Sequence, residues 1–115
     1  MAAGPAGYIR VNPVASTTDR GVRGPTAIPL NTWTHLATTY DGANLRYYVN
    51  GVLVGTTAGT GTINAANGAL RIGGNNSAPL GQGEWFKGLI DEVRIYNRAL
   101  TAAEITGDMT APIVH

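Results

Sequence analysis

The sequence predicts an all-β protein: an antiparallel β-sandwich that closes with one short helical turn. The chain of 115 residues contains 16 glycines, about twice the usual share, and only 13% charged residues, about half of it. Runs of β-branched and aromatic residues recur at hairpin spacing between Gly, Asn, Asp and Pro turns. A helix-start pattern occurs only near the end of the chain. About seven short strands and one helical turn are typical of a two-sheet sandwich.

In the first half of the chain, strands are expected at residues 8–11, 33–40, 44–50 and 52–57, with one more irregular strand in residues 14–29. Asp41-Gly42 is a turn dipeptide between two of these runs. Asn50-Gly51 predicts a two-residue hairpin, because a type I′ turn needs positive φ at both central residues.

In the second half, a polar loop over residues 59–68 leads to the strand "ALRIGG", and the loop 75–83 leads to a last strand over Glu84–Tyr96, kinked at Gly88. Thr101 and Glu104 have the spacing of a capping box, so a helical turn is expected from Ala102 to Thr106, ended by Gly107. Residues 1–7 read as a linker, 8–107 as the sandwich and 108–115 as a tail.

Composition excludes several classes of function. A net charge of +1 gives no electrostatic footprint for nucleic acid or an anionic membrane. The absence of Cys excludes disulfides and thiolate chemistry. No apolar run reaches the length of a membrane span, and the first residues lack the features of a signal peptide.

Three blocks resemble the C-terminal two thirds of a laminin G-like, concanavalin A-like lectin/glucanase jelly roll: "LNTWTHLATTYDGANLRYYVNGVLVGTT", "LRIGG" and "FKGLIDEVRIYNRALTAAEI". The resemblance implies two antiparallel sheets packed face to face in a secreted module attached to other domains. Family members begin with further strands, so the chain is expected to be N-terminally truncated. Its exposed sheet edges then predict a homo-oligomer.

Asp91 is the odd residue of the last expected strand, because it shares a face with Leu89, Val93 and Ile95. A carboxylate on an apolar face must be protonated, hydrogen-bonded or coordinated. The resemblance implies a structural calcium ion with Asp91 as a ligand. The alternative is a carboxylate held by backbone N–H groups or by an arginine, Arg71 or Arg94.

The best candidate for a sugar site is the loop before the last strand. An aromatic plane stacks on sugar rings while amides at loop tips bind hydroxyl groups. Trp85 and the loop residues Asn75, Asn76 and Gln82 provide these groups, although Trp85 could instead cover one end of the core.

Three other aromatic or imidazole positions bear on the site. Tyr47 and Tyr48 alternate along one strand, so only one of them is expected in the core and the other, taken as Tyr48, is expected at a surface site. Trp33 and His35 are expected to be framework residues.

Catalysis finds little support. Asp91 and Glu92 are consecutive in an extended segment and so face opposite ways, and no catalytic residue is predicted. The predicted function is a non-catalytic extracellular module that binds glycans or a cell-surface protein. A structural, adhesive domain that self-assembles through its sheet edges is the alternative, and a glycosidase remnant ranks third.

Overall fold

The computed structural model describes residues 6–12, 18–63, 72–75 and 84–113. The chain divides into two compact units, one made of residues 1–64 with 96–115 and the other of residues 65–95. Each unit is described separately below.

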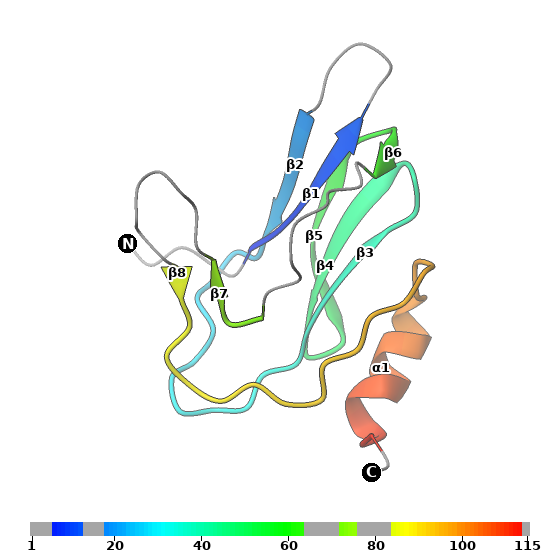
Figure 1. Ribbon diagram of the computed structural model, residues 1–115. Helices are drawn as coiled ribbons and strands as arrows, with labels where there is room; N and C mark the ends of the chain where they lie inside the picture. Colours follow the sequence, from blue (N-terminus) through cyan, green and yellow to red (C-terminus); the bar gives the residue numbers. More distant parts are fainter. Residues whose placement is uncertain (1–5, 13–17, 64–71, 76–83, 114–115) are drawn as a thin grey trace. The chain divides into compact units, whose positions relative to one another are not determined.

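The larger unit contains two three-stranded antiparallel sheets (Figure 1). The first sheet has the order β2-β1-β6, and the second has the order β3-β4-β5. Their strands are β1 (Ala6–Asn12), β2 (Thr18–Arg23), β3 (Leu36–Tyr40), β4 (Asn44–Val49), β5 (Val52–Ala58) and β6 (Thr62–Ile63). The irregular strand expected in residues 14–29 is β2, which pairs with β1 from Ala6 opposite Arg23 to Val11 opposite Thr18.

The core lies where β2 packs on β4 and β5. Val22, Leu45 and Tyr47 are buried together there, and Tyr40, Val49 and Val54 pack against them. Gly55 allows this close approach, since a Cβ at its position would lie 2.8 Å from the carbonyl oxygen of Arg23. Packed antiparallel sheets with an apolar interior confirm the predicted all-β sandwich.

The two predicted turns of the second sheet are present. Asn50 and Gly51 have φ of 51° and 78°, as a type I′ hairpin between β4 and β5 requires. At Asp41-Gly42, one carboxylate oxygen of Asp41 accepts from the N–H groups of Ala43 (2.9 Å) and Asn44 (2.7 Å). The register of β4 against β5 shifts between Tyr47 and Tyr48, which marks a bulge.

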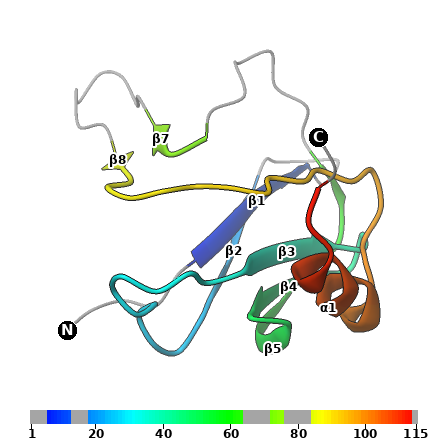
Figure 2. The ribbon, with the colours of Figure 1, turned by 90° about the horizontal axis from the view of Figure 1, so that it is seen from below.

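Helix α1 (Ala102–Thr110) begins with the predicted capping box. The Thr101 hydroxyl accepts from the N–H of Glu104 (3.2 Å), and the Glu104 carboxylate accepts from the N–H of Thr101 (3.1 Å). The predicted end at Gly107 is wrong, because Gly107 continues the helix and its carbonyl accepts from the N–H of Ala111 (3.0 Å). Figure 2 shows α1 beside β3 and β4.

The smaller unit contains the two-stranded ribbon of β7 (Gly74–Asn75) and β8 (Glu84–Trp85). The long last strand predicted over Glu84–Tyr96 is therefore wrong beyond Trp85, since no described residue from 86 to 100 belongs to a strand. Its alternating sequence has a strand pattern, but a strand also needs a neighbour with which to form a ladder.

Candidate functional site

The ribbon β7–β8 joins two of the predicted sugar-site positions. Asn75 pairs with Glu84, and Gly74 pairs with Trp85, so Asn75 and Trp85 occupy successive rungs of one short ladder. Asn76 and Gln82 lie outside the described residues. The backbone thus brings both ends of the predicted loop together at its base.

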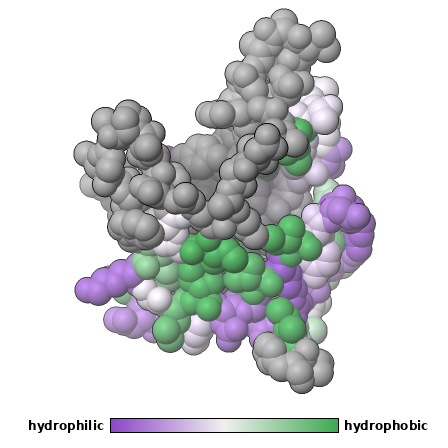
Figure 3. All heavy atoms as spheres, in the orientation of Figure 1, coloured by the Kyte–Doolittle hydropathy of each residue, from purple (hydrophilic) through white to green (hydrophobic). Residues whose placement is uncertain are grey.

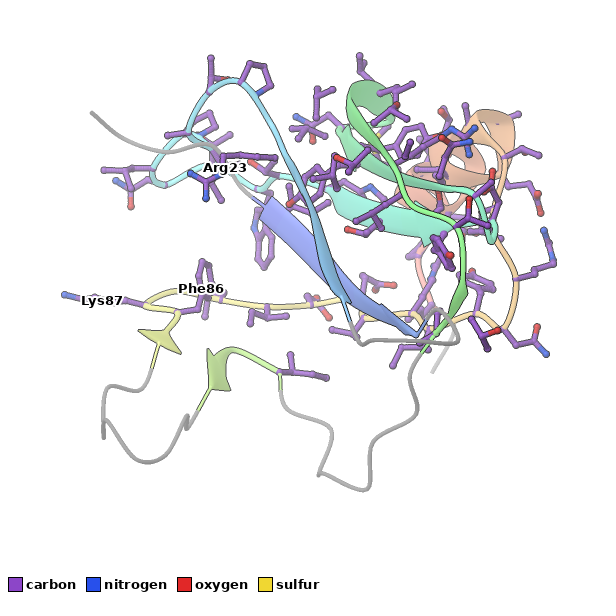
Figure 4. All side chains as sticks on the ribbon, turned by 90° about the horizontal axis from the view of Figure 1, so that it is seen from above. Arg23, Phe86 and Lys87 are labelled. Atoms are coloured by element: carbon purple, nitrogen blue, oxygen red, sulfur yellow. The ribbon has the colours of Figure 1, made fainter. Side chains whose placement is uncertain are left out.

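Phe86 extends this ribbon and was not predicted as a site residue. Its N–H donates to the carbonyl of Gly73 (2.8 Å), which adds one hydrogen bond after the Gly74–Trp85 pair. The side chain of Phe86 is 52% exposed. In Figure 4, the side chain of the neighbouring Lys87 points away from that of Phe86.

Gly88 fixes the place of the Phe86 ring. A Cβ at Gly88 would lie 2.9 Å from Cε1 and 3.0 Å from Cζ of Phe86, so the ring lies directly over this backbone. The signal in the sequence was the pair of consecutive aromatics, Trp85-Phe86, followed two residues later by a glycine. The sequence predicts a strand kink at this glycine, whereas in the structure its missing side chain makes room for an aromatic ring.

Tyr48 does not fit the predicted surface role. It is only 5% exposed, and Tyr47 is equally buried, so the expectation that one of the two is open to a ligand is wrong. Tyr47 lies in the core between the sheets. Thr39, which shares the face of Tyr48 through its pairing with Arg46, is buried as well. The sheet is covered on both faces here, since α1 lies beside β3 and β4 with its Ile105 buried (Figure 2).

Asp91 is exposed, so the premise of a carboxylate buried on an apolar face is wrong. Its supposed neighbours on that face, Leu89 and Ile95, are themselves 77% and 72% exposed. One carboxylate oxygen of Asp91 accepts from the N–H of Glu92 (2.8 Å). This is the backbone N–H alternative considered above; Arg94 instead lies 3.5 Å from the carboxylate of Glu92, and Arg71 is outside the described residues.

A calcium ion bound by Asp91 stays a prediction. Calcium takes six to eight oxygen ligands. Within the described ranges, no three His, Cys, Asp or Glu side chains are grouped so that they could hold a metal ion. Asp91 and Glu92 are in addition engaged with a backbone N–H and with Arg94.

Trp33 and His35, expected as framework residues, differ from each other. Trp33 is 66% exposed, so it does not pack in the core. His35 is held through its backbone, which exchanges two hydrogen bonds with Asn50. Within the described residues, no hydrogen-bond partner is found for the buried Nδ1 of His35.

Two carboxylates with lowered pKa values stabilise local structure and do not belong to the candidate site. The pKa of Asp41 falls from its usual 3.8 to about 2, first because Arg46 donates to it and then because of the N–H groups of Asn44 and Ala43. The pKa of Glu104 falls from 4.5 to about 2, first because of Arg98 and then because of Thr101. These carboxylates stay ionised and hold a turn and a helix start, which is a structural task.

The comparisons with known proteins agree with this architecture. A solved structure of an S-layer domain-containing protein from Clostridium thermocellum is similar, with a TM-score of 0.55 and 25% identity. The similarity covers 80% of this chain and 46% of that one, so this chain spans less than half of the length of its neighbour. No curated protein matches the chain. In the described part of the chain, no helix has both the length and the apolar character that crossing a bilayer requires.

A family model of the laminin G type, described as the concanavalin A-like lectin/glucanases superfamily, matches residues 2–106. The residues that carry the match include both sheets of the sandwich, the ribbon and the start of α1. The chain belongs to the concanavalin A-like lectin/glucanases superfamily.

Proposed function

We propose that this protein is a non-catalytic recognition module of the cell exterior that binds carbohydrate through the ribbon β7–β8 and Phe86. The observation that carries the proposal is the pairing of β7 with β8, which places Asn75 and Trp85 on successive rungs, together with the hydrogen bond from the N–H of Phe86 to the carbonyl of Gly73 at the end of the ladder. Aromatic rings stack on the apolar faces of sugar rings, and amides pair with sugar hydroxyl groups. The ribbon supplies both kinds of group.

The placement of Phe86 supports a binding role. A half-exposed aromatic ring that lies over a glycine loses little further freedom when a ligand packs on it. Lys87, also exposed, adds a donor at the rim of the same short segment (Figure 4). The described part of the site is thus an exposed aromatic ring held over a glycine, with a polar side chain next to it in the sequence.

The chemistry of the carboxylates supports a non-catalytic role. Glycoside hydrolysis needs an acid and a second carboxylate on opposite sides of one bond, about 5 to 10 Å apart. Asp91 and Glu92 are consecutive, and each is engaged locally, Asp91 with the N–H of Glu92 and Glu92 with Arg94. Asp41 and Glu104 are held in a turn and a helix cap.

A glycan array probed with the intact chain and three variants tests the proposal. We expect Trp85→Ala and Phe86→Ala to lose at least tenfold in signal on the glycans that the wild type selects. Trp33→Ala is the matched control, because it removes an exposed tryptophan from the other unit and leaves the ribbon intact. Thermal unfolding checks that each variant is folded.

Two outcomes contradict the proposal. If Trp33→Ala abolishes binding while Trp85→Ala and Phe86→Ala retain it, the site is not on the ribbon. If the wild type selects no glycan but binds a cell-surface protein, the module recognises protein instead of carbohydrate.

A further inference from the structure

Apolar side chains stand exposed along the chain that follows β8. Leu89 and Ile95 are more than two thirds exposed, and Ile90 and Val93 are nearly half exposed. Figure 3 shows apolar surface gathered along this part of the chain. Contiguous exposed apolar surface marks an interaction site in a soluble protein.

The same segment has the sequence of a strand without strand structure. From Ile90 to Tyr96 apolar and charged residues alternate in part, with Val93 and Ile95 on one set of positions and Glu92 and Arg94 on the other. Glu92 interrupts the extended course, since its φ of 56° is left-handed. Such a φ is uncommon for a residue with a side chain.

Asp91 holds this interruption in place. Its carboxylate accepts from the N–H of Glu92 (2.8 Å), and a local bond of this kind competes with a ladder for the backbone donor. A neighbouring strand that offers its own carbonyl groups would favour the extended form at Glu92. The segment is therefore suited to become a strand when a second strand is added beside it.

We propose that a second copy of this chain supplies that strand, by antiparallel pairing of residues 90–96 of both copies about a twofold axis through Val93. In such an interface, residue i meets residue j and residue j meets residue i. Glu92 then lies opposite the partner's Arg94, and Arg94 opposite the partner's Glu92. The same two side chains are already within ion-pair reach in one chain, with 3.5 Å between them.

Charge selects this register over its neighbours. With the axis at Val93, positions 91, 93 and 95 of both copies share one face, and no like charges lie opposite each other. Moving the axis to Glu92 places two glutamates face to face, and moving it to Arg94 does the same with two arginines. Like charges directly opposite each other destabilise a strand pair. If the twofold axis lay between two residues, apolar positions of one copy would lie opposite charged positions of the other, so each face of the strand pair would contain both kinds of side chain.

Complementary variants test the charge pairing. In analytical ultracentrifugation, the average molecular mass of the wild-type chain should rise towards twice the monomer mass as the protein concentration increases. Glu92→Arg alone and Arg94→Glu alone should each remain monomeric, because each makes all four facing charges alike. An equimolar mixture of the two should form a heterodimer, in which opposite charges face again. Neither variant retains the pair within its own chain, so recovery on mixing reports pairing between chains.

A cysteine pair tests the register. The chain has no cysteine, so Val93→Cys introduces a single thiol. On the axis the two thiols face each other within the Cα separation that a disulfide allows. Leu89→Cys is the matched control, because in this register its two copies lie about 26 Å apart along the ribbon. Mild oxidation should therefore cross-link Val93→Cys at least tenfold faster than Leu89→Cys.

Three results would overturn the proposal: a monomeric wild type at all concentrations, no heterodimer on mixing, or cross-linking of Leu89→Cys as fast as that of Val93→Cys. Leu30→Lys checks for unspecific association, since Leu30 is an exposed apolar residue of the other unit. It should dimerise like the wild type, and its failure to do so would also count against the segment. The inference is independent of glycan binding.

Discussion

Asn50 and His35 exchange two hydrogen bonds across the second sheet. The N–H of His35 donates to Oδ1 of Asn50 (2.9 Å), and the N–H of Asn50 donates to the carbonyl of His35 (2.8 Å). Asn50 is at the same time the first residue of the hairpin turn, with φ of 51°. One asparagine therefore closes the β4–β5 turn and fixes the chain just before β3.

Replacing Asn50 separates these two tasks. Asn50→Ala removes the Oδ1 acceptor and places a less tolerant residue at positive φ, so we expect a loss of about 2 kcal/mol in the free energy of unfolding. Asn50→Gly keeps the turn and loses only the acceptor, for about 1 kcal/mol. Urea denaturation measures both. Equal losses in the two variants would mean that the turn conformation contributes nothing.

Alanine substitutions at two glycines test whether α1 packs against the β4–β5 hairpin. Gly42 and Gly51 both have positive φ, 93° and 78°, so alanine at either position is strained. A Cβ at Gly42 meets nothing within 4 Å, whereas one at Gly51 would lie 3.0 Å from the hydroxyl oxygen of Thr106 in α1. Gly51→Ala should therefore lower the melting temperature more than Gly42→Ala. The same decrease in both variants would show that α1 does not lie against the hairpin in solution.

Two substitutions at helix α1 should change the stability of the protein in opposite directions. Thr101→Ala removes the acceptor for the N–H of Glu104 and should cost about 1 kcal/mol of stability. Gly107→Ala should stabilise by up to about 1 kcal/mol, because Gly107 lies inside the helix and a Cβ there meets nothing within 4 Å. Thermal unfolding by circular dichroism measures both. A destabilised Gly107→Ala would mean that the helix ends at Gly107, as the sequence suggested.

Asp41 makes stability depend on pH in the acidic range. Its folded-state pKa of about 2 lies below the usual 3.8, so its contribution is complete above pH 3.8 and is lost as the pH falls towards 2. Asp41→Asn should melt at a lower temperature than the wild type at pH 7, and the two melting temperatures should converge near pH 2. Parallel curves over this range would show that Arg46 and the turn N–H groups do not favour the ionised form.

Glu104→Gln repeats this test in the helix cap. Its pKa falls from 4.5 to about 2, mainly because of Arg98, so its stabilising effect should disappear between those two pH values. The window opens at a higher pH than for Asp41, which distinguishes the two carboxylates in one set of melting curves. Coincident windows would contradict the assignment.

A substitution at Gly88 tests the ribbon site without changing any of the proposed contact residues. Gly88→Ala places a Cβ within 3 Å of the Phe86 ring, so the ring must move. We expect weaker glycan binding with Asn75, Trp85 and Phe86 all present, measured on the same array. Unchanged binding would show that the position of the Phe86 ring does not matter.

Local signals in the sequence were sufficient where the interaction itself is local. Asn50-Gly51 and the Thr101–Glu104 box are made by neighbouring residues, so their spacing alone predicted a turn and a helix start. The exact end of α1 was missed, because glycine is tolerated inside a helix when later residues continue it.

Features that depend on a distant partner were predicted less well. The alternation of residues 86–96 indicated a strand, but in the described structure no ladder forms beyond Trp85. The two-residue strand β6 lies in what was expected to be a loop, because it exists only through its pairing with β1. The burial of Tyr48 depends on cover on both faces of its sheet, which alternation along one strand cannot reveal.

The candidate site was predicted in part for the same reason. Asn75 and Trp85 flank one loop in the sequence, and the pairing of β7 with β8 joins them. Phe86 was missed, because its role depends on the carbonyl of Gly73 and on the absence of a side chain at Gly88, where the ring lies.

The proposed carbohydrate binding is best tested with a glycan array probed with the intact wild-type chain, once in calcium and once in chelator. We expect selective binding to a limited set of glycans that is equal in both buffers, because stacking on an aromatic ring and hydrogen bonding to an amide need no metal ion. Absence of selective binding in both buffers would contradict the proposed function. Binding that disappears in chelator would contradict the assignment of recognition to the ribbon alone.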